Sequence, residues 1–413
     1  MKKIKLLFLG GILSNFLIGQ TPVSLNGSLS VQGNQIVNKN NTVVSFAGPS
    51  LFWSNTWWGG EDYYTKEVVS WVKSDWNATI IRASMGVEAN GGYISDTTNK
   101  ARVKVVVDEA INQGMYVIID WHSHHAEDYK TQAIEFFKEM ANTYGDYDNV
   151  IYEIYNEPLQ ISWSNVIKPY AEDVIEAIRE IDSDNLIIVG TPTWSQDVDV
   201  ASNDPITGYD NIAYTLHFYA GTHTQNLRDK AITALNNGIA LMVTEWGAVN
   251  ANGDGAVDET ETNLWMDFLC DNNLTHCNWA LNDKNEGASA LVQGASTTGG
   301  WSQSDLTTSG NLVKDIVVNW CGGLATNQGE IQNNAINIVA YPNPLQENLT
   351  INLNSNNDSG TLTITDTFGR VVWKHEKKNQ SQLQINTSYL QAGTYFLEVA
   401  NGIEIRTIKL IKK

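Results

Sequence analysis

The stretch YVIIDWHSHHAEDYKTQAIEFFKEMANTYGDYDNVIYEIYNEP, residues 116–158, has the pattern of one strand–helix–strand unit. Its ends, YVIIDWH and VIYEIYNEP, are apolar runs of the kind found in strands buried on both faces. The segment between them, TQAIEFFKEMANTYG, has helical spacing and stops at Gly145, and glycine commonly follows the last turn of a helix. A crossover helix between two strands makes them parallel neighbours.

Apolar runs of this kind recur eight times, and their starts are spaced by roughly 27 to 38 residues, the size of a βαβ unit. Their residue ranges are 43–50, 78–84, 116–122, 150–158, 185–191, 212–220, 240–247 and 276–283. Two further gaps hold helical patterns that stop at Gly114 and Gly238. Eight such units predict an α/β fold, a parallel (β/α)8 barrel. The alternative is a doubly wound open sheet, but no GxGxxG turn follows the first run.

Length and charge limit the classes of function. The 413 residues would accommodate a barrel of about 250 residues and a small second domain. With 26 Lys and Arg against 46 Asp and Glu, the net charge is −20. Nucleic acid and an anionic membrane surface are therefore unexpected partners, because a phosphate backbone needs a basic face. The 14 Trp and 16 Tyr favour flat aromatic faces on which sugar rings can stack.

The N-terminus has the pattern of a secretory signal peptide, which we assign to residues 1–20. Three lysines precede an apolar stretch at residues 6–18, and Gly19 offers a small-residue exit. That stretch is too short to span a membrane, and no later segment has about 18 consecutive apolar residues. We therefore expect a secreted protein, extracellular or at the cell surface.

The last part of the chain changes its pattern. Residues 323–334 are rich in Asn, Gln and Gly and are predicted to be a linker. Beyond them, period-two runs such as LTINLN, TLTITD and TYFLEVA predict a small β-sandwich over residues 335–413. The barrel is then assigned to residues 21–322.

The chain has three cysteines, Cys270, Cys277 and Cys321. Three is too few for a disulfide framework, and an odd number cannot all pair within one chain. Cys270 and Cys277 are close enough in sequence to pair across a short loop. Buried free thiols are the reading that the sequence favours.

Polar and aromatic residues cluster where the apolar runs end. In a parallel barrel these ends share one face, which is where the active sites of such barrels lie. The residues concerned are Arg82, His122, Asn156, Glu157, His217, Tyr219, Glu245, Trp246 and Trp279.

Two of these residues, Glu157 in YNEP and Glu245 in TEWG, suit the cleavage of a glycosidic bond. That reaction needs one carboxyl group to protonate the leaving oxygen and a second to attack the anomeric carbon or to activate water. Asn156 is placed to bond a sugar hydroxyl, and Arg82 to bond Glu245 and hold it ionised. Structural alternatives remain open at this stage: Arg82 in a barrel ion pair, and His217 or Trp279 as part of the core.

The motif DWHSHH brings His122, His124 and His125 together in sequence. A zinc site would need three or four converging ligands. Hydrogen bonds from imidazole to sugar or carboxylate are the favoured reading, and we expect neither a metal nor a cofactor.

The motifs IRASMG, IIDWH, YEIYNEP, LHFYA, VTEWG and NWALNDK together resemble glycoside hydrolase family 5, in its bacterial endoglucanase branch. The resemblance covers about residues 22–322. It implies that Glu157 is the acid/base and Glu245 the nucleophile of a retaining hydrolase. It also implies supporting or substrate-binding roles for Arg82, His122, Asn156, His217, Tyr219, Trp279, Lys284 and Glu286, and for either Trp57 or Trp58. Gly86 stands where some relatives carry an aromatic ring, which puts one stacking platform in doubt.

The C-terminal motifs YPNP (residues 341–344), LQAGTYFLEV and TIKLIKK resemble the type A sorting domain of the type IX secretion system. A generic β-sandwich or a carbohydrate-binding module is the alternative. The whole pattern implies a secreted, monomeric endo-β-1,4-glucanase whose partners are a β-glucan and the secretion machinery. Mannan, xyloglucan or mixed-linkage glucan as substrate, and a non-catalytic polysaccharide-binding surface protein, are the alternative functions.

Overall fold

The computed structural model describes residues 20–321 of the barrel region and most of the strands of the C-terminal region. In the latter the described residues are 337–341, 345, 347–354, 359–366, 369–378, 382–400 and 405–412. The chain divides into two compact units, residues 1–326 and 327–413, and each is considered by itself. The proposed linker and all but the last residue of the proposed signal peptide lie outside the described residues. Among the described helices, none is long and apolar enough to cross a membrane.

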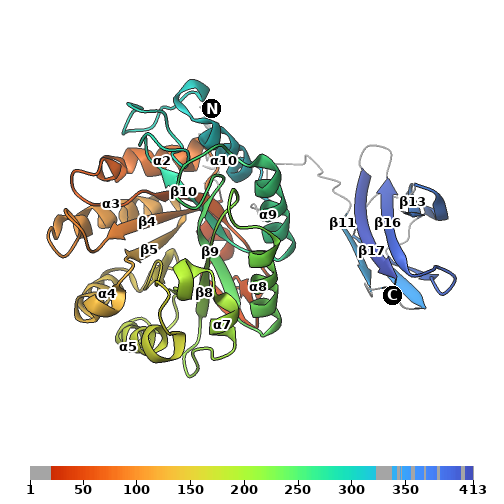
Figure 1. Cartoon of the computed structure of the whole chain (residues 1–413), viewed down its shortest axis with the longest axis horizontal. Coiled ribbons are helices and arrows are strands. Elements are labelled where there is room, and N and C mark those ends of the chain that lie inside the picture. The colour runs from red at the N-terminus through yellow and green to blue at the C-terminus, as the bar shows by residue number, and fades with distance from the viewer. Residues whose placement is uncertain are drawn as a thin grey trace, which may run out of the picture. The chain divides into compact units, whose positions relative to one another are not determined.

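Eight parallel strands close into a barrel in the first unit, with the helices around them (Figure 1). Each predicted apolar run contributes one strand, and every residue of these strands is buried, as the continuous apolar pattern predicts. The strands are β3 (Ala47–Leu51), β4 (Ile80–Gly86), β5 (Tyr116–His122), β6 (Val150–Glu153), β7 (Ile187–Val189), β8 (Ile212–Tyr219), β9 (Ala240–Gly247) and β10 (His276–Leu281). The last strand, β10, pairs with both β9 and β3, so the sheet is closed. The predicted (β/α)8 barrel is confirmed, and the open doubly wound sheet is excluded.

Helices follow the strands and bury one apolar face each against the barrel. The longer ones are α2 (Lys66–Asp75), α3 (Thr98–Gln113), α4 (Lys130–Tyr144), α5 (Lys168–Arg179), α8 (Gln225–Asn236), α9 (Glu259–Asp271) and α10 (Thr308–Val318). The shorter ones are α6 (Pro192–Ser195), α7 (Val198–Ser202), η1 (Gly60–Tyr63), η2 (Ala126–Tyr129), η3 (Trp163–Ile167) and η4 (Gln303–Asp305).

Two of the glycines that end helices do so for different reasons. Gly114 closes α3 with φ 65°, a left-handed conformation that favours glycine. Gly145 after α4 keeps a right-handed φ of −62°. A Cβ there would lie 2.7 Å from the carbonyl oxygen of Ala141 and 3.1 Å from Cβ of Asp182. Close packing, rather than a left-handed turn, therefore requires glycine at position 145.

The end of the barrel opposite the carboxyl ends of its strands is closed by a segment that the sequence pattern did not reveal. It consists of α1 (Pro22–Asn26) and the hairpin of β1 (Ser30–Gln32) and β2 (Gln35–Val37). Leu29 and Ile36 of this segment belong to a buried apolar cluster with Ile80 and Tyr116 at the start of their strands. Strands of three residues are too short for a period-two signal. Because this end is plugged, access from solvent is at the other end.

The C-terminal unit is a pair of antiparallel sheets around one core. One sheet has the order β11 (Asn337–Tyr341), β12 (Asn348–Asn354), β15 (Gln382–Asn386). The other has the order β14 (Val371–Lys378), β13 (Ser359–Asp366), β16 (Gly393–Ala400), β17 (Ile405–Lys412). Leu349 and Ile351 of one sheet share a buried cluster with Leu362 and Leu397 of the other. The predicted all-β sandwich is thus present, with β11 as an additional strand. Residues 342–344 of the YPNP motif lie outside the described residues.

The cysteine prediction is wrong for two of the three residues. Cys270 at the end of α9 forms a disulfide with Cys321, which follows α10. Cys277 lies on β10, is buried and is a free thiol. It belongs to the apolar cluster inside the barrel, so it cannot reach Cys270 on the outer helix layer. The disulfide ties the last helix of the barrel to its neighbour, α9.

We expect loss of this disulfide to destabilise the barrel without changing its fold. The cross-link closes a loop with a sequence separation of 51 residues. In the chain-entropy account such a loop corresponds to about 4 kcal/mol of stabilisation, as an upper figure. A reductant should lower the melting temperature of the wild type by several degrees and leave that of the C270S/C321S double variant unchanged. An equal response of both proteins to the reductant would contradict this prediction.

Candidate active site

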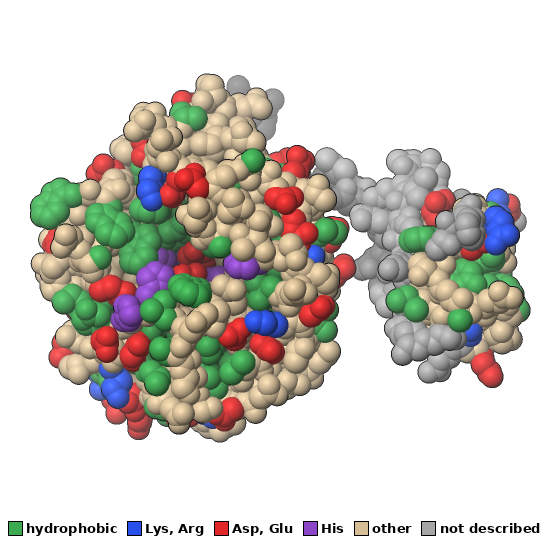
Figure 2. Space-filling model, in the orientation of Figure 1, with side chains coloured by type: hydrophobic (Ala, Val, Ile, Leu, Met, Phe, Trp, Pro, Cys, Tyr) green, Lys and Arg blue, Asp and Glu red, His purple; other side chains and the backbone are tan. Residues whose placement is uncertain are grey.

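The open end of the barrel holds two adjoining cavities of about 500 and 390 Å³. They share six lining residues, which are Glu157, Trp194, Tyr219, Glu245, Ala251 and Asn252. Histidine and acidic side chains gather in a hollow on this face, bordered by hydrophobic side chains (Figure 2). The two cavities therefore form one cleft that continues on both sides of the two glutamates.

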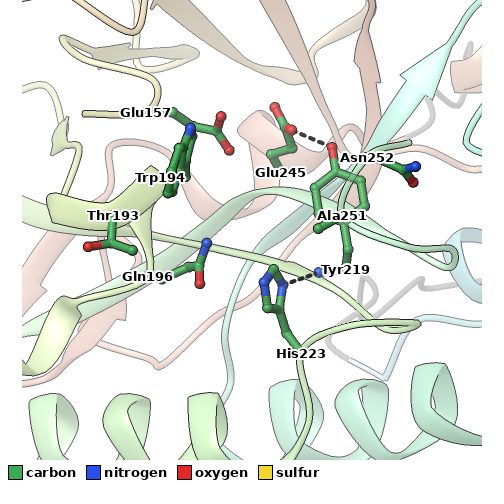
Figure 3. Close-up of a pocket in the computed structure, with 9 residues that line it drawn as sticks. All are labelled: Glu157, Thr193, Trp194, Gln196, Tyr219, His223, Glu245, Ala251 and Asn252. Atoms are coloured by element: carbon green, nitrogen blue, oxygen red, sulfur yellow. Dashed lines mark hydrogen bonds between the residues drawn. The ribbon is translucent and has the colours of Figure 1, made fainter. Parts of the chain in front are cut away.

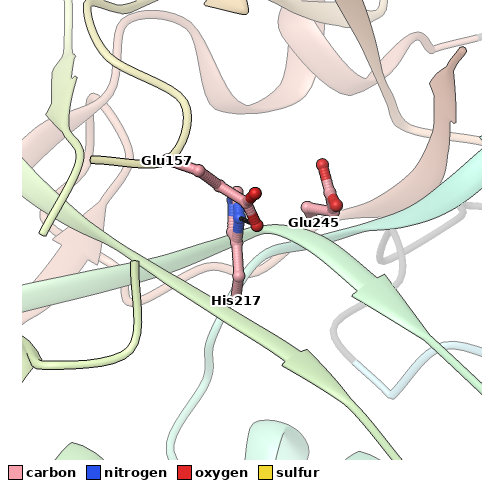
Figure 4. Close-up of side chains that lie close together, drawn as sticks. All are labelled: Glu157, His217 and Glu245. Carbon is pink, nitrogen blue, oxygen red and sulfur yellow. Dashed lines mark hydrogen bonds and ion pairs between the residues drawn. The ribbon is translucent and has the colours of Figure 1, made fainter. Parts of the chain in front are cut away.

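Glu157 and Glu245 face each other across the centre of this cleft (Figures 3 and 4). Glu245 lies on β9, and Glu157 follows the end of β6. Glu157, His217 and Glu245 each offer one ligand atom, and these atoms lie within 4.8 Å of one another. This is the only group of potential metal ligands found among the described residues. The same group is also the arrangement that two cooperating carboxyl groups require.

Arg82 on β4 lies completely buried beneath the two glutamates. Its guanidinium donates through Nε to Glu153 at 2.7 Å and through Nη1 to Glu245 at 3.1 Å. Its Nη2 lies 2.9 Å from a carboxyl oxygen of Asp120 and donates to Oδ1 of Asn156 at 2.6 Å. The bond expected between Arg82 and Glu245 is present, and it is one part of a larger network of buried charges.

Asn156 is oriented by this network. Its oxygen accepts from Arg82, so its Nδ2 group is fixed on the opposite side of the amide. Nδ2 is buried and has no hydrogen-bond partner in the part of the chain that the structure describes. A buried amide donor without a partner is costly, so this group is suited to bind a ligand oxygen.

The two glutamates differ in their partners. Each carboxyl oxygen of Glu245 accepts one bond, from Arg82 and from the Tyr219 hydroxyl at 2.7 Å. Burial raises the pKa of Glu245, while the charge of Arg82 and the bond from Tyr219 oppose the rise. Burial and the nearby charge of Glu245 raise the pKa of Glu157 well above its ordinary value. Of the pair, Glu157 is therefore the carboxyl group more suited to hold a proton.

His122 is held between Asp120 and an indole. Its Nδ1 lies 2.7 Å from a carboxyl oxygen of Asp120, and its ring stacks on that of Trp279 with centroids 5.0 Å apart. Burial lowers the pKa of His122 well below its ordinary value, so the imidazole is neutral. The neighbouring His124 turns to Glu157, with Nδ1 3.2 Å from its carbonyl oxygen, and His125 is exposed. The rings of His122 and His124 thus have different hydrogen-bond partners, and His125 is exposed, so the three histidines of DWHSHH do not converge on one point.

The choice between Trp57 and Trp58 falls on Trp58. Trp58 lines the smaller cavity, whereas Trp57 is 87% exposed and is not among the residues that line the cleft. Trp53, which the sequence analysis did not select, lines the same cavity. Its ring meets His122 edge-on at 4.1 Å and lies 5.6 Å from the ring of Trp58. The motif LFWSNTWW contains three tryptophans, Trp53, Trp57 and Trp58. Nothing in the sequence distinguishes the ones that line the cleft from the one that does not.

The absence of a side chain at Gly86 makes room for the Trp53 ring at the wall of the smaller cavity. A Cβ at Gly86 would lie 1.7 Å from Oδ1 of Asn55 and 3.1 Å from a ring carbon of Trp53. No larger residue fits without moving this loop. Glycine at position 86 therefore leaves the space that the side chains of Asn55 and Trp53 occupy.

Trp194 is the second aromatic residue missed, and it lines both cavities. It lies beside Glu157 in a turn where residues 193–195 have φ of 60°, 55° and 56° (Figure 3). The turn is held by bonds from Trp194 N to the Pro158 carbonyl at 2.8 Å and from Ser195 Oγ to the Asn156 carbonyl at 2.7 Å. Tertiary hydrogen bonds stabilise this left-handed turn without a glycine, so the sequence pattern does not predict it.

Lys284 and Glu286 line the smaller cavity near its rim. The Lys284 ammonium is 2.6 Å from a carboxyl oxygen of Glu286 and 5.2 Å from the centroid of the Phe52 ring. The structure therefore brings the predicted site residues into the cleft or directly beneath it, with two exceptions. Trp57 is exposed outside the cleft, and Trp246 is buried in the apolar core, where its ring stacks on Phe218.

Comparison with known families matches residues 37–285 to the cellulase family, described as glycosyl hydrolase family 5. Residues 339–413 match the secretion system C-terminal sorting domain. The two matches fall on the two compact units of the chain.

Two curated relatives are endoglucanases. Endoglucanase Z of Dickeya dadantii is 60% identical over 293 residues, which is 71% of this chain and 66% of that relative. An endoglucanase of Clostridium saccharobutylicum is 44% identical over 348 residues, 83% of this chain and 75% of that relative. The chain thus spans between about two thirds and three quarters of the length of these relatives.

Solved structures have the same barrel. One from Cytophaga hutchinsonii has a TM-score of 0.70 and 51% identity, and covers 72% of this chain and 96% of that chain. The catalytic domain of Thermobifida fusca endoglucanase Cel5A has a TM-score of 0.68 and 31% identity, and covers 72% of this chain and 99% of that chain.

The buried carboxyl groups around Arg82 make a contribution to the stability of the barrel that falls as the pH rises. Burial raises the pKa of Asp120, and that of Glu153, to about 7. In the unfolded chain such groups lose their protons near pH 4. Between these limits each of the two groups binds more protons in the folded state, so its contribution to the free energy of unfolding falls with rising pH and levels off above about pH 7.

Each such group should lower the free energy of unfolding by about 2 kcal/mol at most between pH 5.5 and pH 8. Buried histidines with a lowered pKa, such as His122 and His217, contribute in the opposite direction, so the test compares two proteins. On going from pH 5.5 to pH 8 in denaturant unfolding, the D120N variant should lose less stability than the wild type, because one titrating carboxyl group is gone. The same change in both proteins would contradict the prediction.

Proposed function

Because the chain belongs to the cellulase family, glycosyl hydrolase family 5, we propose that its barrel is an endo-β-1,4-glucanase that retains the anomeric configuration. The observation that carries this proposal is the pair of carboxyl groups of Glu157 and Glu245, with oxygens within 4.8 Å, at the centre of a continuous cleft. Carboxyl groups about 5 Å apart suit direct attack on the sugar, whereas inversion needs room for a water between them.

In the first step Glu157 donates its proton to the glycosidic oxygen while an oxygen of Glu245 attacks the anomeric carbon. The bond from this carbon to the leaving oxygen breaks, and the leaving sugar departs with the proton. The high pKa of Glu157 and the bonds that Arg82 and Tyr219 donate to Glu245 support this division of roles.

In the second step Glu157, now ionised, removes a proton from water, and the water oxygen attacks the same carbon. The ester bond to Glu245 breaks and its carboxylate is restored. Two inversions at one carbon give net retention. Asn156, whose Nδ2 has no partner in the described structure, is suited to bond the 2-hydroxyl group of the sugar.

The cleft is proposed to hold a glucan chain rather than a single sugar. Trp58 and Trp53 offer rings on one side of the glutamates, and Trp194 offers a ring beside Glu157. A β-1,4-linked glucosyl unit has flat faces of C–H bonds that pack on indole rings. Trp279, His122, Lys284 and Glu286 line the same side as Trp53 and are proposed to contact the bound sugars.

The proposal is tested with a panel of polysaccharides scored by reducing ends. Wild-type enzyme should act faster on carboxymethylcellulose and mixed-linkage glucan than on β-mannan, with the β-anomer as first product. The E245A variant should lose nearly all turnover, because no nucleophile remains. Faster action on mannan would overturn the choice of substrate, and an α-anomer as first product would overturn the mechanism.

A control separates the role of Glu157 from that of Glu245. The E157A variant should keep activity on aryl cellobiosides with good leaving groups, because these need no proton. Azide should restore part of its turnover and give a β-glycosyl azide. The E245A variant should neither keep this activity nor give a β-glycosyl azide when azide is added.

We predict that Trp53 contributes to binding of longer glucan chains. Its ring forms a continuous strip with that of Trp58, so W53A should lower kcat/KM on cellopentaose by about tenfold or more. The W57A variant is the matched control, because the side chain of Trp57 comes from the same loop and lies outside the cleft. Equal effects of the two substitutions would contradict this role.

The C-terminal unit is proposed to be the signal that directs the enzyme to the secretion machinery, as its match to a sorting domain suggests. In this proposal residues 1–20 are a signal peptide, 21–322 the catalytic barrel, 323–334 a linker and 335–413 the sorting domain. The enzyme is further proposed to act as a monomer, because the cleft is formed by one chain.

Truncation after residue 325 should leave the rate on soluble glucan unchanged and prevent release of the enzyme from the native host. Activity assays on culture medium and on cell fractions would measure this. Normal appearance of the truncated protein in the medium would contradict the export role.

A further inference from the structure

A chain of hydrogen bonds runs from the barrel core to Glu157. Glu153 Oε1 accepts from the Thr244 hydroxyl at 2.6 Å, and this hydroxyl lies 2.8 Å from Nε2 of His217. Nδ1 of His217 lies 2.9 Å from Oε1 of Glu157 (Figure 4). Glu153, Thr244 and His217 are all at most 1% exposed, so water does not compete for these bonds.

The direction of each bond follows from the number of protons available. Glu153 accepts from Arg82 Nε on one oxygen and from Thr244 on the other. Burial raises its pKa to about 7, and above that pH it is a carboxylate, which can only accept. The single hydroxyl proton of Thr244 is thus directed to Glu153. Toward His217 the hydroxyl offers only a lone pair, so the proton in that contact must be on Nε2.

His217 has only one N–H group. Burial, followed by the positive charge of Arg82, lowers the pKa of His217 well below its ordinary value, so the ring is neutral. With its proton on Nε2, its Nδ1 presents a lone pair to Glu157. A carboxylate oxygen 2.9 Å from that lone pair would be repelled, whereas a protonated carboxyl group would donate to it.

We propose that Thr244 and Glu153 are positioning residues that fix the Nε2–H tautomer of His217 and thereby keep the proton on Glu157. This inference rests on the proposed role of Glu157 as the acid/base. It adds a reason, independent of net charge, why Glu157 rather than Glu245 holds the proton. Once Glu157 has given up its proton, its carboxylate faces the Nδ1 lone pair, which strengthens it as a base toward water.

The test should break this chain of bonds without replacing a charged or titratable residue. The charged and titratable groups that face Glu157 or His217 come from β4, β5, the segment after β5, β6, β8 and β9. They are Arg82, Asp120, His122, His124, Glu153, His217, Tyr219 and Glu245. The T244V variant leaves all of them in place and removes only the hydroxyl group, and T244S is the matched control because it keeps the hydroxyl.

In T244V, Nε2 of His217 loses its acceptor, and the Nδ1–H tautomer can donate to an ionised Glu157. The pKa of Glu157 should then fall. The alkaline limb of kcat/KM for 4-nitrophenyl cellobioside should move down by about one pH unit, the shift expected from about 1.4 kcal/mol. The 2,4-dinitrophenyl substrate, which needs little protonation, should be affected much less. T244S should match the wild type.

Nitrogen-15 NMR of the His217 ring at pH 8 gives a readout that needs no turnover. We expect the proton on Nε2 in wild type and T244S, and on Nδ1 in a substantial fraction of T244V. A wild-type ring protonated on Nδ1 would overturn the proposal. The proposal would also be overturned if kcat/KM of T244V were lower at every pH while the position of the alkaline limb stayed that of the wild type. If the wild type proved inactive on glucans, the proposed function would fail while the tautomer could still be measured.

Discussion

The site depends on one buried positive charge, the guanidinium of Arg82. It contacts three carboxyl groups, those of Asp120, Glu153 and Glu245, and none of the four groups is appreciably exposed. Nearby carboxylates raise the pKa of Arg82 well above its ordinary value against the effect of burial, so it stays charged. Removing it would leave uncompensated charges in the core, which is among the most destabilising changes a protein can undergo. A lysine would supply the charge but not the fork of donors that also fixes Asn156.

The barrel makes this arrangement possible because its strands are parallel and their carboxyl ends meet. Arg82, His217 and Glu245 each lie on a different strand, yet their side chains reach one point. The opposite end is plugged by the segment around Leu29 and Ile36, so the buried charges are shielded from below. Low local polarity strengthens each hydrogen bond in the network and makes each unpaired group costly.

Much of the fold could be predicted from the sequence, since eight repeated apolar runs carry the same signal many times. The two glutamates were predictable because each follows such a run in a short polar motif. Glu153 and Asp120 were not, because a single acidic residue inside an apolar run looks like an interruption until its partner Arg82 is placed. The pairing of Cys270 with Cys321 likewise depends on which outer helices become neighbours, and the left-handed turn at Trp194 depends on contacts with another loop.

The same limit applies to the roles proposed for the two glutamates. Residue type and position at the end of a strand are alike for Glu157 and Glu245, so neither property distinguishes an acid from a nucleophile. Their partners do, because Glu245 receives a donor on each oxygen, whereas one oxygen of Glu157 faces a ring nitrogen of His217. In our proposal, the Thr244 hydroxyl, which contacts the other nitrogen of the same ring, sets whether Nδ1 donates or accepts. On this proposal, the direction of hydrogen bonds in the barrel core determines whether the carboxyl group of Glu157 in the cleft holds its proton.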